Sequence, residues 1–148
     1  MKVGMILDAI YPSDARVTNE CEELIKNGHE IYLFCLSYQK NYIKSEIIND
    51  IKVRRYYCSS LIYKLSALAN DFPFYSISMK SKIKDFVLKN SIDKVHIHDI
   101  QIAKAAVAVC RKYNLKYVLD LHENRHEIMK SYKHVNSFFG KVLISVKR

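Results

Sequence analysis

The sequence predicts a single α/β domain built on a doubly wound parallel sheet. Short apolar segments alternate along the chain with longer amphipathic ones, as in parallel strands that are joined by helices. The 148 residues are enough for one domain with its own core, and 49% of them are hydrophobic. Only 3 Gly and 2 Pro are present, too few for a loop-rich or disordered chain.

A buried strand, a capped helix and a second strand are expected in the first part of the chain. The apolar run of residues 2–8 (KVGMILD) ends at an acid and predicts the first strand. Asp14 is placed to cap a helix that begins at Ala15, and Gly28 has the position at which a helix commonly ends. Residues 29–36 (HEIYLFCL) predict the second strand, which a polar loop follows.

The middle of the chain predicts a less buried third strand and then helices. Residues 50–57 (DIKVRRYY) alternate apolar and basic side chains, which indicates a strand with one partly exposed side. Residues 59–90 have helical character. A break is expected at residues 71–73 (DFP), because the residue before a proline is pushed out of the helical conformation.

The last part of the chain predicts two more strands around a strong helix. Residues 93–99 (DKVHIHD) and 116–122 (KYVLDLH) are strand-like, and residues 100–114 between them place apolar side chains on one helical stripe. An amphipathic helix is expected over residues 136–148. The default order for five such strands is 3-2-1-4-5, the Rossmann-like arrangement.

Polar residues gather at the ends of three expected strands. Ligands of doubly wound sheets bind beyond the carboxyl ends of the strands, where the strand order reverses. Here those ends hold Asp8 to Asp14, His98-Asp99 and His122-Glu123. No G-x-G-x-x-G or G-x-x-x-x-G-K-[ST] is present, so neither a dinucleotide cradle nor a P-loop is expected.

Charge and cysteine usage limit the partners and the compartment. The net charge of +9 divides into −3 over residues 1–50 and +12 over residues 51–148. Such a basic region suits nucleic acid, an anionic membrane or a phosphorylated ligand, and equally a solvated lysine-rich surface. The four cysteines are scattered, which favours buried thiols in a reducing cytoplasm. Neither a membrane-spanning run nor a signal peptide is evident, so we expect a cytoplasmic protein.

Two groups of residues suggest metal binding. Residues 122–126 (HENRH) match H-E-x-x-H, which binds zinc when it lies on a helix. Here the first histidine ends an expected strand and no acid follows Glu127, so a zinc hydrolase is a remote alternative. His96 and His98 share one face of a strand and could join His122 at a metal. A partly buried His96 bonded to a neighbour is the simpler interpretation, and no metal site is predicted.

Four stretches of the sequence carry a resemblance to a known family. They are YPSDARVTNECEELIKNGHEIYLF (11–34), DKVHIHD (93–99), KYVLDLHE (116–123) and HENRHE (122–127). Together they resemble the amino-terminal half of a family-4 (group 1) glycosyltransferase of the two-domain GT-B architecture. The likeness extends from residue 1 to about residue 130. It implies that residues 1–148 form the acceptor-side Rossmann-like domain. It also implies a carboxy-terminal donor-binding domain that is absent from this chain and supplied in cis or in trans.

The resemblance implies transfer of a sugar, with retention and without a metal or other cofactor, from a nucleotide-sugar to a cell-envelope glycan or lipid-linked acceptor. His98 would then be the catalytic residue, in contact with the transferred sugar or the leaving group. The implied substrate-binding residues are Asp14, Arg16, Asp99, His122, Glu123 and Glu127. For Asp99, capping the helix from Ile100 is the simpler role. Many relatives have a Gly-Gly pair in the first loop, where this chain has Ser13-Asp14-Ala15.

The composition of residues 61–89 is relevant to contact with a membrane. This stretch interleaves apolar and aromatic residues with Lys64, Lys80, Lys82, Lys84 and Lys89. This pattern fits peripheral contact with the inner face of a membrane, although core-facing helices with lysines outside explain it more simply. Nucleic acid is not an expected partner. The alternative function is a non-catalytic α/β binding or regulatory module that needs a partner subunit.

Overall fold

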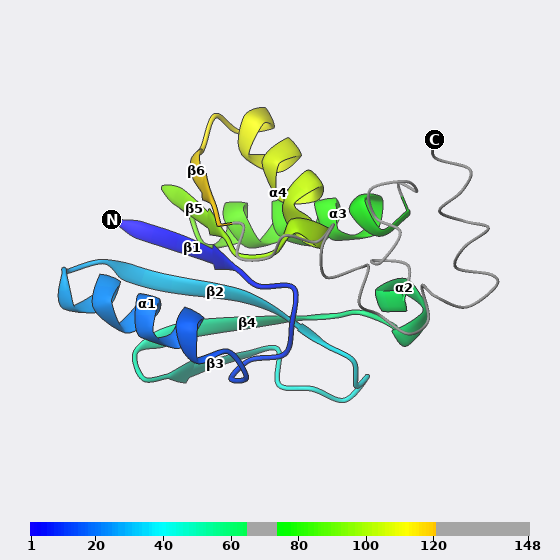
Figure 1. Ribbon diagram of the computed structural model, residues 1–148, viewed down its shortest axis with the longest axis horizontal. Helices are drawn as coiled ribbons and strands as arrows, with labels where there is room; N and C mark the ends of the chain where they lie inside the picture. The colour runs from blue at the N-terminus through cyan, green and yellow to red at the C-terminus, as the bar shows by residue number, and fades with distance from the viewer. Residues whose placement is uncertain (65–73, 121–148) are drawn as a thin grey trace, which may run out of the picture.

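The computed structural model describes residues 1–64 and 74–120. These residues contain a six-stranded sheet of order β3-β4-β2-β1-β5-β6 (Figure 1). The strands are β1 (Lys2–Ile6), β2 (Glu30–Ser37), β3 (Ser45–Ile48), β4 (Ile51–Tyr57), β5 (Lys94–Ile97) and β6 (Lys116–Leu119). The helices are α1 (Ala15–Lys26), α2 (Ser60–Lys64), α3 (Phe74–Lys89) and α4 (Ile100–Lys112). The predicted α/β class is therefore confirmed.

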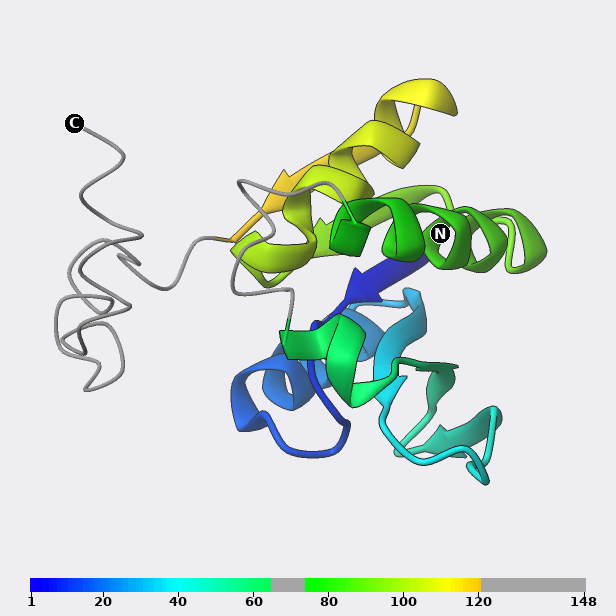
Figure 2. The same cartoon turned by 90° about the vertical axis from the view of Figure 1, so that its right-hand side faces the viewer.

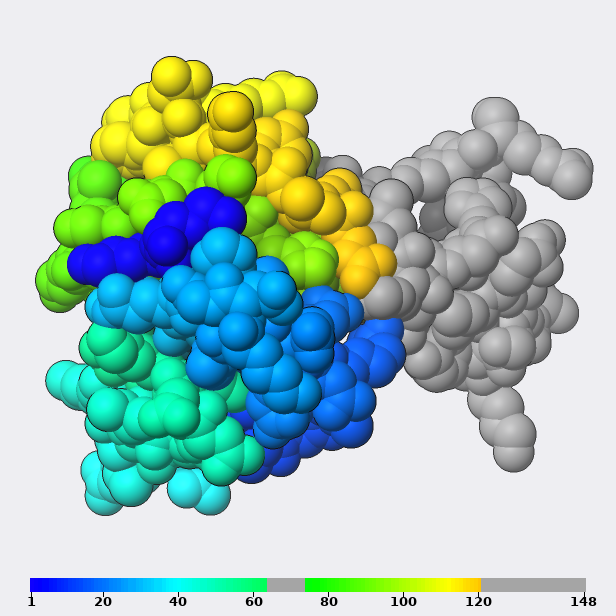
Figure 3. Space-filling view, turned by 90° about the vertical axis from the view of Figure 1, so that its left-hand side faces the viewer, coloured from blue at the N-terminus to red at the C-terminus, as the bar shows by residue number. Residues whose placement is uncertain are grey.

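Five of the strands are parallel and have the expected order. β4, β2, β1, β5 and β6 lie side by side, which is the predicted 3-2-1-4-5 arrangement. β1 is central, since Gly4 pairs with Tyr32 on one side and with Val95 on the other. Seen from the amino ends of the strands, the first residues of the chain lie between the segments that enter β2 and β5 (Figure 3). The opposite ends of these strands form what we call the carboxyl edge (Figure 2).

The segment after residue 36, expected to be a polar loop, contains the additional edge strand β3. This strand pairs antiparallel with β4 through a turn at Asn49 and Asp50, whose φ angles are 48° and 64°. Two successive residues with positive φ make the tight turn that matches the twist of a hairpin. Asn and Asp tolerate that conformation better than other residues with a side chain. Without the glycine of an Asn-Gly pair, the hairpin signal in the sequence is weak.

Helices cover both faces of the sheet, α1 on one face and α3 with α4 on the other (Figures 1 and 2). On the α1 face, Val17 and Cys21 pack in one core cluster with Leu33 of β2. On the other face, Phe34 of β2 meets Phe86 of α3 edge to face, with the ring centroids 5.7 Å apart. The sheet is thus buried on both faces around β1 and β2, which explains why those strands read as continuous apolar runs.

The expected ends of α1 are confirmed. Asp14 is the N-cap residue, and its carboxylate accepts a hydrogen bond from the backbone N–H of Arg16 at 3.0 Å. At the other end Gly28 has a φ of 77°, in the left-handed region that glycine adopts without strain. The backbone N–H of Gly28 donates to Ile25 and that of His29 donates to Leu24, so the last carbonyls of the helix are paired.

Some sequence expectations lie outside the described residues. They are the helix break at residues 71–73, the H-E-x-x-H stretch at residues 122–126 and the helix over residues 136–148. Within residues 1–64 and 74–120, none of the helices has the length and apolar character needed to span a bilayer.

Candidate functional site

Asp8 follows β1 and is buried at the carboxyl edge, with 7% of its surface exposed. Its Oδ1 accepts a hydrogen bond from the hydroxyl of Tyr75 on α3. Its backbone N–H donates to Oδ2 of Asp99 at 2.7 Å. Burial, and then the Asp8 carboxylate, raise the pKa of Tyr75, which keeps its hydroxyl protonated as a donor. These bonds connect the end of β1 to α3 and to the start of α4.

The side chain of Asp99 does not cap the helix from Ile100, contrary to the sequence prediction. Asp99 is the N-cap residue of α4, as predicted, but its side chain makes no capping hydrogen bond. The carboxylate instead accepts from the backbone N–H of Asp8, on the neighbouring strand tip. The reason is that a buried backbone N–H beyond the end of a ladder needs an acceptor, and Asp99 is the one that β5 brings next to it.

Asp14 and Arg16 form a local pair where α1 begins. The guanidinium of Arg16 donates to both carboxylate oxygens, at 3.2 Å from Nε and 2.8 Å from Nη2. The hydrogen bond from the Arg16 side chain lowers the pKa of Asp14, and the same bond raises the pKa of Arg16. The side chain of Arg16 is still 51% exposed. A shallow, open pocket of about 320 Å³ lies beside the pair, lined by Pro12, Ser13, Asp14, Ala15, Thr18 and Asn19.

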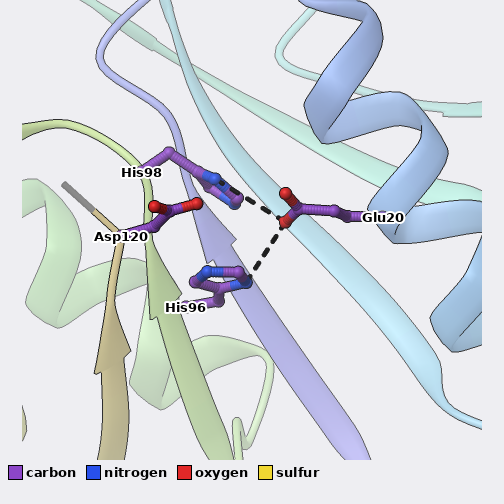
Figure 4. Close-up of side chains that lie close together, drawn as sticks. All are labelled: Glu20, His96, His98 and Asp120. Atoms are coloured by element: carbon purple, nitrogen blue, oxygen red, sulfur yellow. Dashed lines mark ion pairs between the residues drawn. The ribbon is translucent and has the colours of Figure 1, made fainter. Parts of the chain in front are cut away.

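Four further side chains converge between α1 and the ends of β5 and β6, and we call Glu20, His96, His98 and Asp120 the His–carboxylate cluster (Figure 4). One ligand atom of each lies within 4.8 Å of those of the others. Oε2 of Glu20 is 3.4 Å from Nδ1 of His96 and 3.9 Å from Nδ1 of His98. The prediction that the two histidines share one face is confirmed, since their ring centroids are 4.3 Å apart.

His98, the predicted catalytic residue, is only 3% exposed. Its backbone N–H donates to the carbonyl of Ile6 at 3.0 Å, which extends the pairing of β5 with β1 up to the strand tip. The sheet backbone therefore fixes the position of His98 at the point where the strand order reverses. The simpler interpretation of His96, a partly buried histidine bonded to a neighbour, agrees with its 22% side-chain exposure, and the neighbour is Glu20 at 3.4 Å, an ion-pair contact.

The sequence alone singled out neither Glu20 nor Asp120 as a site residue. A signal for Glu20 was available, because Val17, Glu20 and Leu24 follow one ridge of α1. An acid on the ridge that faces the sheet needs a polar partner, and the histidines of β5 lie there. Three of the predicted binding residues, His122, Glu123 and Glu127, lie outside the described residues, so the His122 contribution to a metal set with His96 and His98 stays a prediction.

No family model matches the sequence, and no curated protein sequence matches it significantly. Solved structures share its fold. Sucrose-phosphate synthase from Thermosynechococcus elongatus matches with a TM-score of 0.67 and 12% identity, over 98% of this chain and 39% of that one. Trehalose-6-phosphate synthase from E. coli, solved with UDP-2-fluoro glucose, matches with a TM-score of 0.56 and 14% identity. The match covers 80% of this chain and 32% of that one.

A third match is the C-terminal domain of a hydrogenase from Pyrococcus furiosus, with a TM-score of 0.58 and 15% identity, over 81% of this chain and 90% of that one. At these identities the likeness shows the fold alone. The two synthases are GT-B glycosyltransferases, and the fold that this chain shares with all three proteins is Rossmann-like. It spans 39% and 32% of the lengths of the two synthases.

Proposed function

We propose that this chain is the amino-terminal, acceptor-side domain of a family-4 (group 1) glycosyltransferase. The whole enzyme would transfer a sugar, with retention and without a metal ion, from a nucleotide-sugar to a cell-envelope glycan or lipid-linked acceptor. The observation that most supports this proposal is the place of His98. It lies at the tip of the fourth parallel strand of a GT-B-like sheet, next to β1, where such sheets bind their ligands.

The charge of the carboxyl edge supports an acceptor-side role. Five carboxylates lie at or near this edge, on Asp8, Asp14, Glu20, Asp99 and Asp120. Carboxylate oxygens accept hydrogen bonds from the hydroxyl groups of a sugar, whereas they repel a diphosphate. Arg16 is the basic group beside them, and it already pairs with Asp14. The edge is therefore better suited to an acceptor sugar than to the phosphates of a donor.

The start of α1 supports a separate donor-binding domain. A helix N-terminus can bind phosphate through its unpaired backbone N–H groups. Here the carboxylate of Asp14 already accepts from the N–H of Arg16, and its negative charge occupies the place that a phosphate would take. The absence of the family's Gly-Gly pair has the same consequence. The donor diphosphate would therefore bind mainly to the carboxy-terminal domain, in cis or in trans.

His98 is proposed to act on the transferred sugar or the leaving group. Negative charge develops on the diphosphate as its bond to the sugar breaks, and a donor held in place before the reaction stabilises that charge. Oε2 of Glu20 lies 3.9 Å from Nδ1 of His98, too far for a direct hydrogen bond but close enough to attract the ring electrostatically. Glu20 would thus be a positioning residue. Arg16, half exposed beside the open pocket, would contact the substrate at the outer part of the site.

Peripheral contact with the inner face of a membrane is part of the proposal. On α3, Phe74 and Ile77 are 64% and 63% exposed, and Lys80 and Lys84 are exposed beyond them. Such a mixture of apolar and basic side chains suits an anionic lipid surface. Lys82 does not belong to this surface, because it is partly buried and its ammonium group donates to Ser78 at 2.8 Å. Burial lowers the pKa of Lys82 accordingly.

The alternative, a non-catalytic module that needs a partner subunit, has one supporting observation. The hydrogenase domain has a similar fold over 90% of its length, so this fold also occurs outside the glycosyltransferases. The two functions differ in what the whole protein does with a donor. We expect the whole protein, or this chain mixed with its second half, to release nucleoside diphosphate from a UDP- or GDP-sugar.

The control is each half assayed alone, which we expect to be inactive. No release with any donor, from a protein whose two halves bind each other, would support the non-catalytic module instead. The donor-binding domain of the family carries an acidic E-x7-E motif, so a second α/β half with this motif, encoded after Arg148, would be independent support for the enzyme.

A further inference from the structure

We propose that the His–carboxylate cluster binds a divalent transition-metal ion, of which Zn²⁺ is the best representative. The four side chains come from three elements: Glu20 from α1, His96 and His98 from β5 and the residue after it, and Asp120 from the end of β6 (Figure 4). A bound ion would therefore connect α1 to two strand ends. The ion would have a structural role, so this proposal does not rest on the proposed sugar transfer, which needs no metal ion.

The spacing of the ligand atoms favours a shared ion over direct hydrogen bonds. The contacts of Glu20 with the two imidazoles, 3.4 Å and 3.9 Å, exceed the usual 2.7–3.2 Å of an N–H···O hydrogen bond. Two ligands of one tetrahedral zinc, each about 2.0–2.1 Å from the metal, lie about 3.4 Å apart. The full spread of the cluster, 4.8 Å, exceeds that value by an amount that small side-chain rotations remove.

The carboxylate of Glu20 supplies an independent reason for a ligand. Its Oε2 is inaccessible to solvent and, within the part of the chain that the structure describes, accepts no hydrogen bond. A buried carboxylate oxygen without a donor is costly, because it has lost its water without compensation. A cation between Glu20 and the imidazoles removes that cost.

The donor set selects the class of ion. Two imidazoles and two carboxylates suit Zn²⁺ and other first-row divalent ions. Mg²⁺ and Ca²⁺ prefer sites made of oxygen ligands alone, so they should bind weakly here. Because the four ligands come from three segments that are far apart in sequence, a bound ion also opposes unfolding, since the unfolded chain does not hold the site.

The test is calorimetric titration of the metal-free protein with Zn²⁺, with Mg²⁺ as the comparison, together with thermal unfolding. We expect one Zn²⁺ to bind at the cluster and to raise the Tm by about 5 °C or more at saturating Zn²⁺, while Mg²⁺ does neither. Glu20→Gln and His96→Asn should each weaken this binding more than about tenfold. The matched controls, Glu23→Gln on the same helix and His29→Asn, should bind Zn²⁺ as the wild type does.

A competing site is the H-E-x-x-H stretch, so the titration is repeated with His126→Asn. Binding that is unchanged in His126→Asn and weakened in Glu20→Gln and His96→Asn assigns the ion to the cluster. The proposal is overturned if the wild-type protein binds no Zn²⁺. It is equally overturned if Glu20→Gln and His96→Asn bind Zn²⁺ as tightly as the wild type does. Circular dichroism checks that each variant is folded. The Tm shift with Zn²⁺ is measured on the wild type and therefore tests the proposal even if a variant does not fold.

Discussion

The hydroxyl of Tyr75 donates a hydrogen bond to the buried carboxylate of Asp8, across 67 positions of sequence. Asp8 follows the central strand β1, and Tyr75 lies in the first turn of α3. The bond therefore ties the helix layer of one face to the carboxyl edge at the point where the strand order reverses. Asp99, from the other side of that point, accepts from the backbone of the same Asp8.

Replacing Tyr75 by Phe should destabilise the fold. The change removes one donor from a buried carboxylate and leaves the ring in place, so we expect a loss of about 1–3 kcal/mol in the free energy of unfolding. Denaturant titration measures this value. Tyr117→Phe is the control, because Tyr117 is 36% exposed and should tolerate the change. Equal stability of the two variants would show that the Tyr75–Asp8 bond contributes nothing.

Asp14 should give a small, pH-dependent stabilisation. Its pKa in the folded chain lies below the ordinary value of 3.8, chiefly because of the hydrogen bond from the Arg16 side chain. The stabilisation is therefore complete at pH values above 3.8 and is lost as the pH falls through the lowered pKa. Because Arg16 is half exposed, we expect less than about 1 kcal/mol.

Asp14→Asn tests this dependence, because Asn still caps a helix but carries no charge. Unfolding is followed from neutral to acid pH, and the wild type should lose its advantage over Asp14→Asn in acid. In an Arg16→Gln background the advantage should be smaller, because only the backbone N–H donors to the Asp14 carboxylate remain. If the wild type were more stable than Asp14→Asn by the same amount at every pH, the Asp14–Arg16 charge pair would not be the origin of the difference.

The four cysteines should be unreactive in the folded protein. All four are free and buried. Burial raises the pKa of Cys21 and Cys35 to about 12 and that of Cys58 and Cys110 to about 11. Since the thiolate is the reactive form, a thiol reagent at pH 8 should label none of them quickly, and all four in denaturant. Rapid labelling of any one cysteine without denaturant would show that its surroundings open readily.

The parallel core was predictable because its signals are local. The apolar runs of β1 and β2, Asp14 at the start of α1 and Gly28 at its end each follow from a few neighbouring residues. The edge strand β3 was missed, since its turn at Asn49-Asp50 lacks glycine. The contacts of Asp99 and Glu20 were missed for another reason. Their partners, Asp8 and the β5 histidines, are distant in sequence and adjacent only once the sheet has formed.

The most direct test of the account is the turnover of His98→Ala beside that of the wild type, each with its donor-binding half present. We predict that the wild type transfers sugar with release of nucleoside diphosphate from a UDP- or GDP-sugar. His98→Ala should lower kcat by about 100-fold or more, because a group held at the reacting bond is removed. His29→Ala, away from the carboxyl edge, should leave kcat unchanged. Absence of turnover with every donor, or equal turnover of His98→Ala and wild type, would contradict the account.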